Sequence, residues 1–263
     1  HSFPTRRSSD LDKKAEVTAL QAISAEDRKD WISLAFVQAG ICVCVPAFLL
    51  GALLAEAMPI WPAIISGSLG YLIVVVGMVA TGMIGCDLGL ASCTCCQAGF
   101  GKSGARFIVS TIFAVNMIGW FGIQNGVCGE AFSNAMLAMT GWDIPVVVSN
   151  TIWGIIMLLT AVYGVHALEK LDKISIPLLM IIMCYGTFLA FKVYGTGNLN
   201  DEGTVQSMSF MSGVALSFNF TAVGTITGPD YTRFQKSRKD TVKSVFYGVF
   251  PMGVITLIMG IVL

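Results

Sequence analysis

The sequence predicts an all-α protein that crosses a membrane several times. Of its 263 residues, 55% are hydrophobic and 12% are charged, and the mean hydropathy is +0.74. Soluble domains carry about 25% charged residues. The charges here are also clustered, which leaves long apolar stretches that need lipid around them. This composition disfavours a soluble enzyme, a nucleic-acid-binding protein, a disordered chain and a disulfide-stapled secreted domain.

Seven stretches are long enough to cross a bilayer, which takes about 20 mainly apolar residues in a helix. In chain order they are residues 31–56, 61–82, 105–136, 144–165, 174–191, 205–227 and 242–263. The seventh runs to the end of the chain with no flanking charge or turn. We therefore expect the chain to be truncated in span seven, as the N-terminal fragment of a longer protein.

The N-terminal region divides into two parts. Residues 1–11 resemble the translation of a sequencing-adapter oligonucleotide, and we expect them to be an adapter-derived scar that is not native. Residues 12–30 are polar and form a cytoplasmic N-terminal segment. The transmembrane domain then covers residues 31–263.

The basic residues predict the orientation of the chain. They lie before span one and in every second loop, and only Lys192 falls on the opposite side. The clustered residues are Lys13, Lys14, Arg28, Lys29, Lys102, Arg106, Lys170, Lys173, Arg233, Lys236, Arg238, Lys239 and Lys243. Because basic loops are retained in the cytoplasm, we expect a multi-pass protein of the plasma (inner) membrane with a cytoplasmic N-terminus.

The first span contains Gly40 and, near its middle, Pro46. Proline donates no backbone hydrogen bond, so it frees carbonyl groups on the preceding turn. The carbonyls between Gly40 and Cys44 could then coordinate a hard cation such as sodium. The alternative is an ordinary proline kink, which membrane helices often contain.

The sixth span is rich in small and polar residues over 217–225 and is followed by Gly228 and Pro229. An unwound segment here would expose backbone donors and acceptors to a solute. The alternative is a helix packed through small residues, with its hydroxyl groups bonded to its own backbone. Broken spans one and six, five spans apart, indicate an inverted-repeat transporter whose site lies where the broken helices meet.

The third span supplies a possible binding surface. Asn116, Trp120 and Gln124 recur every four residues and so share one helix face. An indole can stack on a flat heteroaromatic ring, and a carboxamide offers that ring's edge both a donor and an acceptor. Packing or an interfacial position for Trp120, and an interhelical hydrogen bond for Gln124, are the alternatives. No catalytic triad or metal cluster is visible in the sequence, so we expect no enzyme activity.

Two stretches resemble the nucleobase–cation symporter family 1, in particular its cytosine permease branch. They are NMIGWFGIQ at residues 116–124 and GTITGPDYTRF at residues 224–234. Residues 85–101 and 164–171 are also similar to that branch. The resemblance covers nearly all of residues 31–263. It implies a fold of twelve spans in which the first ten form two inverted repeats of five.

The resemblance also implies roles for particular residues. A base would stack on Trp120 and contact Gln124, and a second aromatic from span six, Phe220 or Phe218, would close the sandwich with Asn219 beside it. The backbone carbonyls of Gly40 and of Val43 or Cys44 would bind sodium, with the other ligands coming from an eighth span. No other cofactor or metal is expected.

The predicted function is that of a secondary active transporter. It would import cytosine or a related purine or pyrimidine, coupled to sodium or protons by alternating access. The alternatives are a carrier of the same fold for hydroxymethylpyrimidine, hydantoin, allantoin or an amino acid, and a membrane sensor that does not transport. The expected partners are the nucleobase and the lipid bilayer, with no nucleic acid and no obligate protein partner.

Overall fold

A computed structural model describes residues 21–162, 164–195 and 207–263, which are almost entirely helical. The proposed scar at residues 1–11 lies outside these ranges. The chain forms two compact units. One contains residues 111–171, and the other contains residues 19–110 and 172–263.

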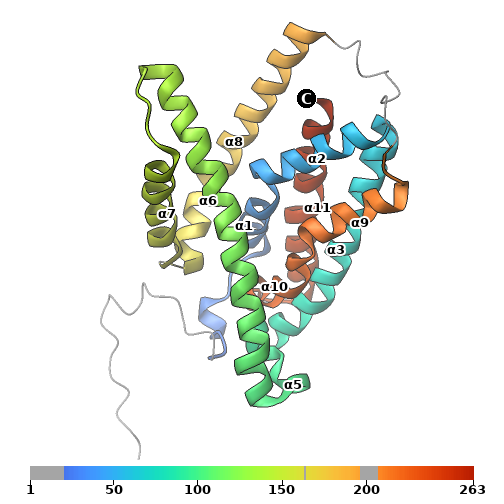
Figure 1. The fold of residues 1–263 in the computed structure, drawn as a ribbon. Coiled ribbons are helices and arrows are strands. Elements are labelled where there is room, and N and C mark those ends of the chain that lie inside the picture. Colours follow the sequence, from blue (N-terminus) through green and yellow to red (C-terminus); the bar gives the residue numbers. More distant parts are fainter. Residues whose placement is uncertain (1–20, 163, 196–206) are drawn as a thin grey trace, which may run out of the picture. The chain divides into compact units, whose positions relative to one another are not determined.

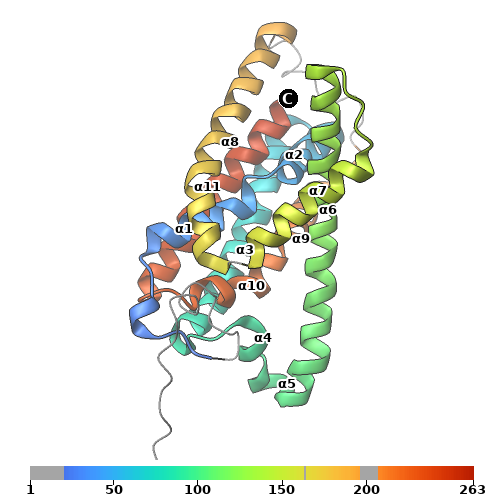
Figure 2. The same cartoon turned by 90° about the vertical axis from the view of Figure 1, so that its left-hand side faces the viewer.

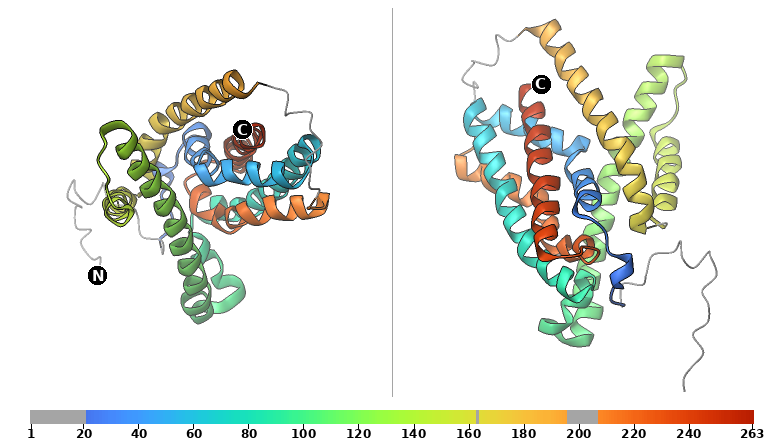
Figure 3. Two further views of the ribbon diagram at one scale, coloured as in Figure 1. Left: turned by 45° about the horizontal axis from the view of Figure 1, so that its top comes forward. Right: turned by 180° about the vertical axis from the view of Figure 1, so that it is seen from behind.

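The larger unit is built around a long central helix, α11 (Arg238–Val262). α11 packs against α1 (Trp31–Cys42), α2 (Val45–Ala57) and α3 (Ile60–Leu88). α3 also packs against α9 (Phe210–Thr221) and α10 (Val223–Thr232), as Figures 1 and 3 show. We refer to α1, α2, α3, α9, α10 and α11 together as the bundle. Shorter elements lie at its ends: a 3₁₀ helix at Ala25–Asp27, a π-helical turn at Ala105–Val109, α4 (Ser92–Cys95) and α5 (Gln97–Gly104).

Glycine residues set how closely the helices of the bundle approach. A Cβ atom on Gly51 of α2 would collide with the Leu257 carbonyl on α11, and one on Gly260 of α11 would collide with the Phe48 carbonyl on α2. No hydrophobic force drives helices together in lipid, so they associate through packing and interhelical hydrogen bonds. Small residues at the contact allow the backbones to approach closely enough for that packing. The α2–α11 contact is therefore made backbone to backbone.

The smaller unit pairs α6 (Ser110–Thr140) with α7 (Val146–Val162) (Figure 2). The Ser149 hydroxyl donates to the Gly129 carbonyl at 2.8 Å, and the rings of Phe132 and Trp153 meet edge to face at 5.5 Å. α8 (Gly164–Tyr194) begins in this unit and continues in the larger one.

The described parts of the seven predicted spans are largely helical, but fewer than seven helices are long and apolar enough to cross a membrane. Within the described part of the chain, five helical stretches are long and apolar enough to cross a membrane: Ile60–Leu88, Gln97–Thr140, Lys170–Val193, Phe210–Thr232 and Arg238–Val262. The bent pair α1 and α2 forms a sixth, and α7 is a shorter apolar helix. α8 begins at Gly164, ten residues before the predicted start at residue 174, because the glutamate and lysines at 169–173 are good helix formers.

Candidate functional site

The first span is interrupted at two residues, as the glycine and proline pattern predicts. Val43 (φ −86°, ψ 75°) and Cys44 (φ −147°, ψ 156°) leave the helical region, so α1 ends at Cys42 and α2 begins at Val45. The two halves are bent by 52° (Figure 1). Pro46 lies in the first turn of α2, where its missing N–H costs no helical bond. It cannot donate to the Cys42 carbonyl four residues earlier, which explains why the helix stops there.

The end of α1 presents carbonyl oxygens that an unbroken helix would use internally. The Cys44 carbonyl accepts the N–H groups of Ala47 and Phe48, at 3.1 and 3.3 Å, in the first turn of α2. Among the residues that the structure describes, no hydrogen bond reaches the carbonyls of Gly40 or Val43. Of the three predicted cation ligands, Gly40 and Val43 are thus the more available, and Cys44 is the least.

The interruption of span six is smaller than predicted. α9 and α10 are separated only by Ala222, which keeps a helical conformation (φ −54°, ψ −32°). The expectation of an unwound segment over residues 217–225 is therefore corrected. Polar side chains account for the difference: the Ser217 hydroxyl donates to the Gly67 carbonyl of α3 at 2.7 Å, and the Thr221 hydroxyl donates to the Ser217 carbonyl at 3.1 Å. Their hydrogen bonds are satisfied inside the helix and across a tight helix contact.

The three α9 residues expected to contact substrate lie in different surroundings. Phe220 packs against the buried cluster that contains Tyr71 and Met78. Phe218 is half-buried and Asn219 is exposed. Phe220 is half-buried like Phe218, so Asn219 has the most surface left for a ligand, and the ring of Phe220 also contributes to the core of the bundle.

The third predicted surface lies on an unbroken helix, α6 (Figure 2). Trp120 and Gln124 are half-buried and Asn116 is exposed. α6 packs on α7 around Gly129, where a Cβ atom would collide with the Asn150 side chain. At about 100° of rotation per residue, the Trp120 face lies about 180° from the Gly129 face. The predicted binding face is therefore separate from the α6–α7 contact.

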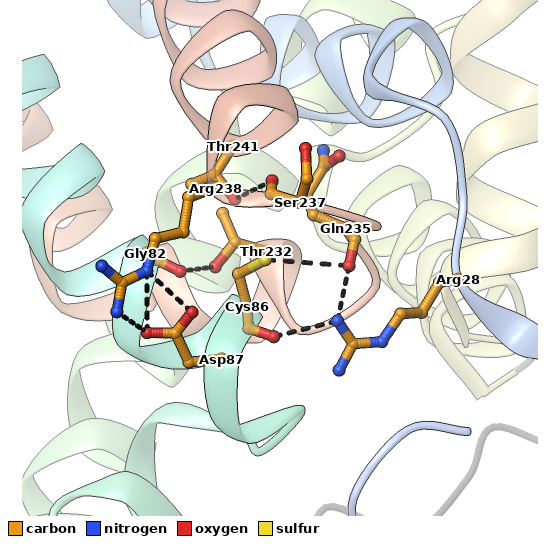
Figure 4. Close-up of polar contacts among 9 residues, drawn as sticks. All are labelled: Arg28, Gly82, Cys86, Asp87, Thr232, Gln235, Ser237, Arg238 and Thr241. Atoms are coloured by element: carbon orange, nitrogen blue, oxygen red, sulfur yellow. Dashed lines mark hydrogen bonds and ion pairs between the residues drawn. The ribbon is translucent and has the colours of Figure 1, made fainter. Parts of the chain in front are cut away.

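Arg28 joins three segments at one end of the larger unit (Figure 4). Its Nη1 atom donates to the backbone carbonyls of Cys86, near the end of α3, and of Gln235, between α10 and α11, both at 3.0 Å. The Lys29 N–H donates to the Phe234 carbonyl at 2.6 Å. The segment before α1 is thus fixed to the turn between α10 and α11.

Two ion pairs reinforce the same end of the bundle. Arg238 Nε donates to both carboxylate oxygens of Asp87, at 2.9 and 3.0 Å (Figure 4), and Lys236 pairs with Asp30 at 2.6 Å. The N-terminal segment and the loop between spans six and seven, predicted to lie on one side of the membrane, are therefore in direct contact.

The loop after α3 carries thiols that are poor nucleophiles. Burial raises the pKa of the Cys93 and Cys95 thiols above the usual value, so both stay protonated at neutral pH. Asp230 accepts the Ser92 N–H at 3.1 Å and ties α4 to α10. Among the residues described, no group of three histidine, cysteine or acidic side chains could hold a metal ion.

One acidic residue with no role predicted from the sequence lies beside the break in span one. A Cβ atom built on Gly40 would lie 3.2 Å from Oδ2 of Asp172, in α8. One turn later, Ile176 is buried in a small cluster with Ala39 and Val43. Residue 172 falls between predicted spans four and five, beside Lys170 and Lys173, and only the four-residue spacing to Ile176 indicates that it continues an apolar helix face.

A bundle of apolar helices whose first span is discontinuous is typical of secondary transporters, which bind solutes where such helices are broken. Residues 23–263 match a family model described as a permease for cytosine/purines, uracil, thiamine and allantoin. The chain belongs to this family of membrane permeases, which are transporters and not enzymes. The resemblance to nucleobase–cation symporter family 1 is thereby confirmed.

Individual relatives agree with the family assignment. The chain is 27% identical to the cytosine permease of Escherichia coli (strain K12) over 237 residues, which cover 89% of this chain and 54% of that protein. It is 25% identical to the purine-uracil permease NCS1 of Arabidopsis thaliana, covering 84% of this chain and 41% of that protein. It is 23% identical to the allantoin permease of Bacillus subtilis (strain 168), covering 85% and 50%.

A solved structure supports the fold. Mhp1, a nucleobase-cation-symport-1 family transporter in a closed conformation with bromovinylhydantoin bound, superposes with a TM-score of 0.85 at 17% identity. The match covers 94% of this chain and 57% of Mhp1. The chain spans about half the length of the curated relatives it matches.

Proposed function

We propose that the protein imports a nucleobase, cytosine or a related purine or pyrimidine, coupled to sodium ions or protons. The observation that carries this proposal is the family match over residues 23–263, together with the names of the relatives. The protein is proposed to act in the plasma (inner) membrane with its N-terminus in the cytoplasm.

In this proposal, the base stacks on Trp120 and its edge bonds to the Gln124 carboxamide. Phe218 or Phe220 forms the opposite wall, with Asn219 beside it. An indole face suits a flat heteroaromatic ring, and the mid-helix position of Trp120 in α6 supports this role. A small aliphatic solute would have no use for such a platform.

Transport is proposed to occur by alternating access. The close contacts of α1, α2, α3, α9, α10 and α11 support movement of the bundle as one body. A cation at the break of α1 would order that break, and a base that prefers the same conformation would then bind more tightly. Because linkage is reciprocal, the base would raise the affinity for the cation by the same factor.

Uptake of tritiated cytosine by cells producing the protein tests the proposal. Competition with unlabelled purines, uracil, allantoin, a hydantoin and amino acids identifies the substrate class. We expect nucleobases to compete. Competition by amino acids and not by bases would contradict the proposal, and binding without uptake would favour a sensor.

A hydantoin or allantoin carrier is the second candidate function. The names of the Bacillus subtilis relative and of the Mhp1 ligand favour it. Stronger competition by allantoin or a hydantoin than by any base would select this candidate.

A further inference from the structure

The carboxylate of Asp172 lies beside the first span, against Gly40, three residues before the break at Val43. Gly40, which it contacts, comes nine residues after Trp31 at the start of α1, so it lies about 13 Å along the helix axis at 1.5 Å per residue. Acidic side chains of membrane helices that face a neighbouring helix are kept mainly where they serve a solute or ion.

The contact between Asp172 and Gly40 is close and involves the whole carboxylate group. A Cβ atom on Gly40 would lie 3.2 Å from Oδ2 and 3.3 Å from both Oδ1 and Cγ. Glycine thus makes room for the carboxylate at this point. Below it, Ile176 packs on Ala39 and Val43, with Met180 and Met183 around the same cluster. The spacing 172, 176, 180 and 183 shows that Asp172 continues the face of α8 that packs on the end of α1.

Asp172 has no counter-charge in the part of the chain that the structure describes. No hydrogen bond or ion pair there involves it, and the side chain is half-buried. Lys173 is adjacent in sequence, and neighbouring residues of a helix do not face each other. A partly desolvated carboxylate without a partner favours the binding of a cation.

The neighbouring backbone completes the chemistry of a cation site. No donor among the described residues reaches the carbonyls of Gly40 and Val43, and Pro46 removes the donor that the Cys42 carbonyl would otherwise have. Carboxylate and carbonyl oxygens are the ligands that hard cations prefer. One anionic and several neutral oxygens suit a monovalent ion.

We propose that Asp172, packed on Gly40 at the break of the first span, is the anionic ligand of the coupling cation, which we take to be sodium. This inference rests on the proposed function, because it assumes cation-coupled transport. The ion would join α8 to α1, so its binding and release would control whether α8 stays packed against the bundle.

Sodium binding is tested without transport by thermal unfolding of the purified protein. Sodium chloride is titrated against potassium chloride at constant ionic strength, and the unfolding midpoint is recorded. A ligand that binds only the folded state raises the midpoint in a saturable way. We expect this for the unmodified protein, and we expect Asp172→Asn to raise the half-saturating sodium concentration at least tenfold.

Two further variants make the result specific. Gly40→Ala keeps the charge but makes the carboxylate shift by a few tenths of an ångström, so it should raise the half-saturating sodium concentration, by less than Asp172→Asn does. This variant also tests the site if Asp172→Asn fails to fold. Asp143→Asn neutralises an exposed acid after α6 and should leave the sodium curve unchanged. Wild-type sodium affinity in Asp172→Asn, or no sodium-specific stabilisation of the unmodified protein, would overturn the inference.

The inference and the proposed function fail separately. Sodium stabilisation that depends on Asp172 in a protein that takes up no base would retain the cation site and reject the substrate. Uptake of cytosine with no sodium effect on the unfolding midpoint would reject the cation site and retain the substrate.

Discussion

At the residue scale, Trp120 carries the most testable part of the proposed substrate site. Stacking of a base on an aromatic side chain contributes about 1–3 kcal/mol. Trp120→Ala should therefore weaken cytosine binding by about 5- to 150-fold. The protein should still be produced and folded, because the Trp120 face of α6 lies away from α7. Equilibrium binding of radiolabelled cytosine measures the change.

Trp142 provides the matched control for this experiment. It lies in the segment after α6, and 69% of its surface is exposed. Trp142→Ala removes an indole from the same unit and should leave cytosine affinity unchanged. An unchanged affinity in Trp120→Ala would remove the stacking argument.

At the element scale, the contact between α2 and α11 depends on two glycines. A methyl group on Gly51 would collide with the Leu257 carbonyl and lie 2.9 Å from the backbone of Gly260. Backbone atoms cannot move aside as a side chain would, so Gly51→Ala should lower the free energy of unfolding by about 1–3 kcal/mol. Thermal unfolding measures this. Gly99→Ala adds the same group where nothing lies within 4 Å, and an equal loss of stability in that control would contradict the prediction.

The two arginines at the end of the bundle should differ in importance. Arg28→Gln leaves two partly buried carbonyls without their donor and should cost about 1–3 kcal/mol. Arg238→Gln breaks an exposed ion pair with Asp87, and such pairs contribute little in water. Chemical denaturation of both variants makes the comparison. A larger loss for Arg238→Gln would show that the charge pair holds this end together.

The helices of this fold could be predicted because long apolar runs and one proline are local signals. Pro46 indicated a break that is observed two to three residues before it, at Val43 and Cys44. Span six misled the prediction because the same small and polar residues suit an unwound segment and a packed helix. The hydrogen bond from Ser217 to Gly67, 150 residues apart, decides between them, and no local pattern contains it.

The candidate site was less predictable for the same reason. The predicted carbonyls of Gly40 and Val43 follow from the sequence around Pro46. Asp172, 132 residues after Gly40, reaches that place only through the packing of α8 on α1. The helical repeat alone was enough to predict that Trp120 and Gln124 share one face of α6. Their role in binding a base remains a prediction.

At the scale of the whole molecule, the contacts of the larger unit bring the N-terminal segment and the turn between α10 and α11 to one end of the bundle. These segments and the first turn of α11 carry Arg28, Lys29, Lys236, Arg238 and Lys239. Since short basic segments are retained on the cytoplasmic side, that end should face the cytoplasm. The segment after α6, with Asp143 and no basic residue, should then lie outside.

Cysteine labelling tests this orientation in a variant whose eight native cysteines are replaced. Single cysteines introduced as Asp143→Cys and Lys239→Cys are both at exposed positions. A membrane-impermeant maleimide added to intact cells should label position 143 and not position 239, and permeabilised cells should show both. The reverse pattern would place the basic end outside. It would contradict the cytoplasmic N-terminus and, with it, the direction of import, because the end of the bundle held by Arg28 would then open to the medium.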